Sequence, residues 1–212
     1  MEQIPPSPTG PPLPLLVAPT RPEFAAVQRG VLASAAAGRV RAACCGAGEY
    51  RVRRFCQALP PGTVSQLVLI GWAGGLVPEL AAGETICANE VLAEGRPALA
   101  CAPLPLRGAR TGPILTVPRA LFTPEEKIQA RLSGGLAVEM EAYPLADWAG
   151  ERGIPFSQVR LILDAWDEPL PDPTRLANLP ALPVRLWALF RRIRALNPRL
   201  ESLARETAER LV

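Results

Sequence analysis

Two stretches decide the fold of this chain: Ala137-Val138-Glu139-Met140-Glu141-Ala142 and, further along, Val159-Arg160-Leu161-Ile162-Leu163-Asp164. Each is an apolar run that ends in carboxylates, and a helical segment separates the two. In an open α/β sheet, parallel strands end at one edge, and ligands bind beyond those carboxyl ends. The two acidic stretches are therefore predicted to face one pocket.

The rest of the chain alternates between strand-like and helix-like patterns. Apolar runs predict strands at 13–18, 40–45, 66–70, 84–93, 115–118, 137–141 and 156–163, and helical patterns occur at 24–37, 49–59, 124–132 and 143–152. This alternation predicts one α/β domain over residues 13–212, with a central mixed, mostly parallel sheet flanked by helices. Residues 1–12 are rich in proline and are predicted to form a disordered arm.

Three other segments carry structural expectations. Residues 94–114 are rich in turn signals and predict a strand pair or a flap near the pocket. The pattern is helical from Arg175 onward, and Asn197-Pro198 is expected to break it before a final helix over 200–212. The segment 182–196 is amphipathic and rich in arginine. It is interpreted as a helix packed on its own domain or at a subunit contact, with a membrane surface as the alternative.

Composition excludes several kinds of chemistry. The chain has no histidine, which excludes Ser-His-Asp and Cys-His catalysis and histidine-bound zinc. No metal site is expected. Its five cysteines include no C-x-x-C pair, and there is no signal peptide, which favours reduced thiols in a cytoplasmic protein. The net charge of +3 comes without a basic, aromatic-rich stripe, so nucleic acid is not an expected partner.

Two glycine-rich segments follow predicted strands. Gly71-Trp72-Ala73-Gly74-Gly75-Leu76 is expected to be a loop that a ligand can approach closely. It has neither the G-x-G-x-x-G spacing of dinucleotide sites nor the G-K-[ST] ending of a P-loop, so no cofactor is expected. Gly46 and Gly48 precede a helix and could present backbone N–H groups to an anion, although a tight turn is the commoner explanation.

Taken together, the motifs resemble a known family. The glycine segment followed by Gly83-Glu84, then residues 137–142, then Pro155-Phe156 leading to Asp164, are similar to the nucleoside phosphorylase superfamily, in its methylthioadenosine/S-adenosylhomocysteine nucleosidase branch. The resemblance extends over roughly residues 64–168. It implies a phosphorylase-like fold and a homo-oligomer. It also implies a small-molecule purine nucleoside substrate, with adenine as the base, whose N-glycosidic bond is cleaved by water or phosphate.

The resemblance also implies roles for individual residues. Met140 would pack against the sugar, and Glu141 would accept hydrogen bonds from the ribose hydroxyls. Asp164 would protonate or hydrogen-bond N7 of the departing purine. The remaining substrate-binding candidates are Glu139, Trp72, Ala73 and Gly74. Carboxylates also suit an oxocarbenium-like transition state on general grounds. The alternative for Glu139 is a structural hydrogen bond, and for Glu141 and Asp164 an ion pair with Arg160 or Arg152.

The nucleophile is left open between two schemes. The nucleosidases place a glutamate just after the first strand to activate water, and Glu23 stands at about that position. The phosphorylases hold phosphate with an arginine and a glycine-rich turn, for which Arg21, Gly46 and Gly48 are the candidates. Glu23 could instead be a charge that stabilises a helix N-terminus.

Some residues depart from the family pattern. Trp72 and Leu163 each stand where the family has a hydroxyl-bearing residue, and the 94–114 region is shorter. Overall length, the acidic proline-bearing loop after Asp164 and the arginine-rich C-terminal helices resemble the hopanoid-associated phosphorylase-like proteins. That resemblance implies removal of adenine from a lipid-linked nucleoside, adenosylhopane. The alternative is a catalytically weakened protein that still binds nucleosides.

Overall fold

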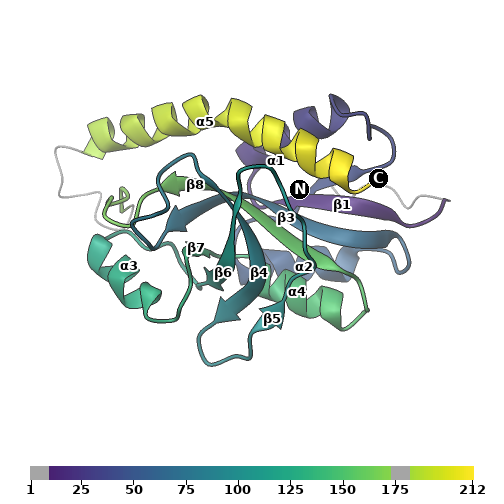
Figure 1. Cartoon of the computed structure of the whole chain (residues 1–212), viewed down its shortest axis with the longest axis horizontal. Helices are drawn as coiled ribbons and strands as arrows, with labels where there is room; N and C mark the ends of the chain where they lie inside the picture. The colour runs from purple at the N-terminus through teal and green to yellow at the C-terminus, as the bar shows by residue number, and fades with distance from the viewer. Residues whose placement is uncertain (1–9, 173–181) are drawn as a thin grey trace.

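The eight strands of the described residues form one sheet (Figure 1). The structure is a computed structural model that describes residues 10–172 and 182–212. Most of the predicted N-terminal arm and the first residues of the predicted C-terminal helical region lie outside these ranges. The strands are β1 (Leu13–Ala18), β2 (Arg41–Cys44), β3 (Val64–Gly75), β4 (Thr85–Ala93), β5 (Leu99–Ala100), β6 (Arg110–Thr116), β7 (Ala137–Glu139) and β8 (Phe156–Asp164).

The sheet is mixed and mostly parallel, as predicted. Parallel pairs join β1 to β2 and β3, β3 to β8, and β6 to β4 and β7, whereas β3–β7, β4–β5 and β4–β8 are antiparallel. Strands β3, β7, β6, β4 and β8 thus pair in a closed ring. This closure brings the ends of β3, β7 and β8 together, which places the two acidic stretches at one site.

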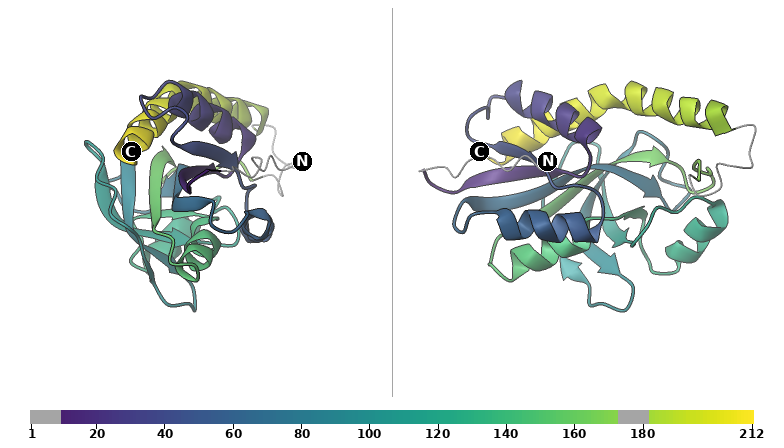
Figure 2. Two further views of the ribbon diagram at one scale, coloured as in Figure 1. Left: turned by 90° about the vertical axis from the view of Figure 1, so that its right-hand side faces the viewer. Right: turned by 180° about the vertical axis from the view of Figure 1, so that it is seen from behind.

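Helices cover both faces of the β1–β3 part of the sheet (Figure 2). The helices of the described ranges are α1 (Arg21–Leu32), α2 (Glu49–Ala58), α3 (Pro124–Arg131), α4 (Ala142–Gly150) and α5 (Leu182–Arg210). Helices α1 and α5 cover one face and α2 and α4 the other, whereas α3 packs in a separate cluster with β6 and β7. Side chains of a strand alternate between its two faces. In β1, Leu15 and Val17 pack with α2 and α4, whereas Leu16 and Ala18 pack with α1 and α5. Burial on both faces explains the continuous apolar runs that predicted these strands.

The glycine segment expected to be a loop is part of β3, so that prediction was wrong. Residues Gly71 to Gly74 pair with β8, and Gly74 and Gly75 also pair with β7. Glycine is needed here because other side chains come close. A Cβ on Gly71 would lie 2.4 Å from Glu23 Oε1, and one on Gly74 would lie 3.2 Å from Asp164 Oδ2. Because Gly71 and Gly74 lack side chains, the carboxylates of Glu23 and Asp164 can lie directly against β3. The loop prediction did not include these contacts.

The predicted helix break at Asn197-Pro198 is also wrong. Helix α5 continues through Pro198, and its C-terminal half is buried against α1. At Gly30 the two helices touch closely enough that a Cβ would lie 2.2 Å from the Glu201 carbonyl oxygen. This tertiary packing outweighs the hydrogen bond that proline removes from a helix. Helix α1 itself begins and ends earlier than the predicted 24–37.

Candidate active site

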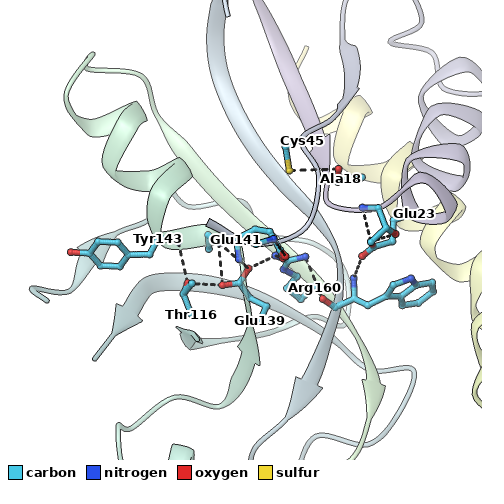
Figure 3. Close-up of polar contacts among 12 residues, drawn as sticks. Ala18, Glu23, Cys45, Thr116, Glu139, Glu141, Tyr143 and Arg160 are labelled. Atoms are coloured by element: carbon cyan, nitrogen blue, oxygen red, sulfur yellow. Dashed lines mark hydrogen bonds and ion pairs between the residues drawn. The ribbon is translucent and has the colours of Figure 1, made fainter. Parts of the chain in front are cut away.

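Glu139 ends β7 and anchors the start of α4. Its buried carboxylate accepts hydrogen bonds from the N–H groups of Glu141 and Ala142, each at 2.9 Å, which satisfies donors of the first helical turn. The Thr116 hydroxyl donates to the other oxygen, and the Arg160 guanidinium pairs with the carboxylate (Figure 3). Both oxygens are thus engaged by the protein. These contacts fit the structural alternative better than direct substrate binding.

Glu141 is held on one side by a backbone N–H and on the other by arginine. Gly48 N donates to Oε1 at 3.0 Å, and Arg160 Nη2 lies 3.5 Å from Oε2. Burial, together with the charge of Glu139, raises the pKa of Glu141 to about 7 although Arg160 opposes the shift. The carboxyl group is therefore poised between its two forms near neutral pH. The Gly48 N–H, predicted to bind phosphate, is already occupied by Glu141.

Arg160 links the acidic groups of the site. Its side chain is fully buried on β8, between Glu139 and Glu141 on one side and Glu23 on the other (Figure 3). Burial alone would favour the neutral guanidine, but the three carboxylates outweigh it and raise the pKa of Arg160. One charged arginine therefore stabilises several nearby carboxylates in a buried setting. The predicted alternative partner, Arg152, instead pairs with Glu151 at the surface.

Glu23 reaches the same region from the start of α1. Oε1 accepts a hydrogen bond from Trp72 N at 2.7 Å, and Oε2 accepts one from Thr20 N at 3.0 Å. Burial raises the pKa of Glu23, although hydrogen bonds from Thr20 and Trp72 and the charge of Arg160 oppose the shift. The side chain therefore caps the helix and also faces the site. This geometry is compatible with both roles considered for Glu23, stabilisation of the helix N-terminus and activation of water.

Asp164 ends β8 and pairs with Lys127 of α3. The two side chains are almost completely buried and form an ion pair through Oδ2. Burial raises the pKa of Asp164, and the adjacent ammonium group opposes that shift. Lys127 was not predicted from the sequence as the partner of Asp164. It is the only lysine of an arginine-rich chain, which was the one available signal.

The loop after β8 completes the environment of Lys127. The ammonium group also donates to the carbonyl oxygens of Ala165, at 2.5 Å, and Glu168, at 2.9 Å. The Glu168 carboxylate is in turn bound by Arg192 of α5, at 2.5 and 2.9 Å. A continuous set of contacts therefore connects α5 to the Asp164 carboxylate. It holds that carboxylate although Leu163 supplies no hydroxyl.

These groups surround one cavity of about 240 Å³. Eight of the predicted residues line it: Glu23, Trp72, Ala73, Gly74, Glu139, Met140, Glu141 and Asp164. Arg21 and Gly46 instead line a neighbouring cavity of about 540 Å³, which shares Pro19, Thr20 and Ala47 with the first. Gly48 lines neither of these two cavities. The structure thus brings the carboxylates into one cavity and places two of the predicted phosphate ligands, Arg21 and Gly46, in another, while the third, Gly48, binds Glu141.

A larger cavity adjoins the site on its other side. It has a volume of about 880 Å³ and shares Val117 and Met140 with the carboxylate-lined cavity. Trp72 packs partly into the hydrophobic cluster of α1 and α5, so it is a core aromatic as well as a cavity wall. Within residues 10–172 and 182–212, no group of three His, Cys, Asp or Glu side chains is arranged to hold a metal ion.

Comparison with solved structures gives close agreement in fold. The chain matches S-adenosylhomocysteine nucleosidase from Streptococcus pyogenes with a TM-score of 0.71 at 16% identity, covering 96% of this chain and 99% of that one. The chain has the fold of the nucleosidases. Futalosine hydrolase of Helicobacter pylori matches with a TM-score of 0.70 at 12% identity, covering 94% and 97%. Methylthioadenosine/S-adenosylhomocysteine nucleosidase from the same organism matches at 0.68 and 14%, covering 95% and 96%.

Sequence comparison matches a shorter part of the chain than structural comparison does. A profile of the phosphorylase superfamily matches residues 98–180, a segment that contains β6, β7, α4 and β8. No curated protein matches the chain by sequence. The matched segment includes both acidic stretches from which the fold was predicted.

Proposed function

We propose that this protein cleaves the N-glycosidic bond of a purine nucleoside, with adenine as the base and water as the nucleophile. One observation supports this most strongly: buried carboxylates from three separate elements, Glu23, Glu141 and Asp164, line one cavity. Three acids in a small buried space are unfavourable for folding unless counter-charges offset them, and such clusters occur preferentially at functional sites. The fold shared with the nucleosidases is consistent with this chemistry.

Each carboxylate fits a separate task. Glu141 accepts hydrogen bonds from the ribose hydroxyls and so fixes the sugar. Glu23 takes a proton from the water that attacks C1′, while the electrons of the C1′–N9 bond move into the purine. Asp164 in its protonated form, which burial favours, donates that proton to N7 and so neutralises the leaving base. Lys127 then stabilises the Asp164 carboxylate that remains.

Water is preferred over phosphate because of where the candidates lie. Glu23 lines the cavity together with Asp164 and Glu141, whereas Arg21 and Gly46 line the neighbouring one. The Gly48 N–H is bound to Glu141. Phosphate would therefore have to bind outside the carboxylate-lined space, with Arg21 as its available ligand.

We further propose an apolar substituent at the 5′ position of the sugar, as in adenosylhopane. The carboxylate-lined cavity has an apolar side formed by Leu121, Leu163 and Leu170 together with Trp72. Its volume of about 240 Å³ lies below the range of roughly 300–1,000 Å³ that is usual for sites holding drug-sized ligands. A bulky substituent would extend into an adjoining cavity, and the 880 Å³ space beyond Met140 has the necessary size.

The test is release of adenine measured by chromatography. Adenosine, methylthioadenosine and adenosines with alkyl chains at the 5′ position would be incubated with the protein, with and without phosphate. We expect adenine and free ribose products without phosphate, and faster turnover as the alkyl chain lengthens. Calorimetric binding of these nucleosides without any turnover would instead support the alternative, a nucleoside-binding protein that has lost its chemistry. Loss of turnover in Asp164→Asn would exclude that alternative.

A further inference from the structure

The N-terminal half of α5 exposes large apolar side chains. Val184, Trp187 and Phe190 are 67%, 59% and 67% exposed, and they recur at three-residue intervals along one side of the helix. Adjacent exposed aromatic and aliphatic residues of this kind mark an interaction surface more often than an ordinary protein surface. We call these three residues, with Arg191 and Arg194, the α5 apolar face.

The two halves of α5 differ in their surroundings. The C-terminal half packs on α1, with Leu200, Ala204 and Ala208 fully buried. Figures 1 and 2 show the N-terminal half extending beyond α1, toward the end of the molecule that contains α3. The α5 apolar face therefore cannot be attributed to packing within the described domain.

The charge of this segment favours an anionic partner. Residues 182–200 contain five arginines and no aspartate or glutamate. Arg191 lies over the Trp187 ring, with its Cζ 4.6 Å from the ring centroid, and Arg194 is exposed one turn further on. Aromatic side chains with arginines beside them are typical of helices that lie in the interface of a lipid bilayer.

We propose that the α5 apolar face binds the surface of an anionic lipid bilayer. Trp187 and Phe190 would enter the boundary between headgroups and acyl chains, while the arginines contact lipid phosphates. A second copy of the chain fits this face less well. A two-fold contact would bring together two copies of segment 182–200, which carries five arginines and no acid, and this is unfavourable. This is attachment to one leaflet, since no helix of the described ranges is long and apolar enough to cross a membrane.

Bilayer contact would also place the active site at the membrane. Arg192, on the same helix, binds Glu168 in the loop after β8, and Leu170 of that loop lines the carboxylate-lined cavity. The loop therefore contacts α5 through Glu168 and the cavity through Leu170. A substrate carried in the bilayer could therefore reach the cavity without crossing bulk water. The membrane proposal does not depend on the substrate, and binding is measured without turnover.

Co-sedimentation with vesicles tests the proposal. Vesicles of phosphatidylcholine and phosphatidylglycerol would be compared with pure phosphatidylcholine, using the complete chain. We expect binding to the anionic vesicles that weakens with added salt, because exposed charge interactions are screened. The double variant Trp187→Ser, Phe190→Ser should bind at least about tenfold more weakly, since two aromatic anchors are lost. Arg191→Gln with Arg194→Gln should weaken binding and reduce its dependence on salt.

A matched control distinguishes binding by the α5 apolar face from non-specific binding of vesicles by any exposed apolar side chain. Leu32 is 68% exposed on α1, away from this face, and Leu32→Ser should bind vesicles as the wild type does. Circular dichroism would confirm that each variant folds. Equal binding of wild type to neutral and anionic vesicles, or equal binding by the aromatic double variant, would overturn the proposal. So would dissociation of an oligomer by that variant, seen by light scattering without any vesicle binding, because the face would then be a subunit contact.

Discussion

Lys127 and Asp164 form an ion pair whose side chains are 1% and 3% exposed, at the end of β8 in the carboxylate-lined cavity. The same ammonium group binds the carbonyl oxygens of Ala165 and Glu168, so its contacts extend into the loop that α5 holds through Arg192. The Asp164 carboxylate is thus connected to a helix distant in sequence. Lys127 thereby orients the Asp164 carboxylate.

Replacing Lys127 with methionine should destabilise the protein and stop turnover. The variant leaves the Asp164 carboxylate buried without its counter-charge, which typically costs about 3–5 kcal/mol. Urea unfolding measures the loss. The double variant Lys127→Met, Asp164→Asn should recover much of the stability, because neither partner then carries a charge, but it should release no adenine. Equal stability of the single and double variants would show that the pair is not energetically coupled.

Nucleoside binding should depend on the protonation of Glu141. Its pKa is about 7, and the ionised form is the better acceptor for ribose hydroxyls. Affinity should therefore rise as the pH increases from 6 to 8, and binding near pH 6 should release a proton. Calorimetry in buffers of different ionisation enthalpy measures that proton directly. Glu141→Gln should bind more weakly at pH 8 and lose this pH dependence.

The same group should affect stability in the opposite direction. A carboxyl group whose pKa is raised by folding favours the folded state most when it is protonated. Its contribution is complete below the unfolded value of 4.5 and declines as the pH rises through about 7. The free energy of unfolding of Glu141→Gln, relative to that of the wild type, should therefore increase between pH 5 and pH 8. A constant difference across that interval would contradict the raised pKa.

Glu23 and Arg21 distinguish hydrolysis from phosphorolysis. Glu23→Gln should remove turnover while nucleosides still bind, because the amide cannot accept a proton from water. Arg21→Ala should leave turnover in phosphate-free buffer unchanged, since Arg21 lines the neighbouring cavity. Turnover that requires phosphate and is lost in Arg21→Ala would identify the protein as a phosphorylase.

Gly71 should not tolerate a side chain. Its Cβ would lie 2.4 Å from Glu23 Oε1 and 2.9 Å from Arg160 Nη1, so alanine would displace both charged groups. We expect Gly71→Ala to lose roughly 1–3 kcal/mol of unfolding free energy, as is usual for overpacking, together with most of its turnover. The matched control is Gly150→Ala, at the end of α4, where the added Cβ meets no atom within 4 Å. Thermal unfolding should separate the two variants clearly.

The sequence predicted most of the fold because buried parallel strands leave a simple pattern. The alternation of apolar runs and helical patterns predicted an α/β domain, and the acids at the ends of β7 and β8 predicted a shared pocket. The pocket prediction assumed parallel strands, whereas β7 runs antiparallel to β3 and its acids reach the pocket through the closed ring. Patterns of glycine and proline were less reliable. They predicted a loop at Gly71 and a helix break at Pro198, since local propensity does not include the side chains and helices that pack there.

What the sequence alone determined was the set of chemical groups: carboxylates at strand ends and no histidine to assist them. Which of them share a cavity was decided only by the closed ring of strands, which joins β3, β7 and β8. The partners of those acids were likewise decided by the tertiary structure. Lys127 lies 37 positions from Asp164 and Arg160 lies 21 from Glu139, and no local pattern indicates such pairs. Burial of a charge requires a counter-charge, but only the fold determines where it comes from.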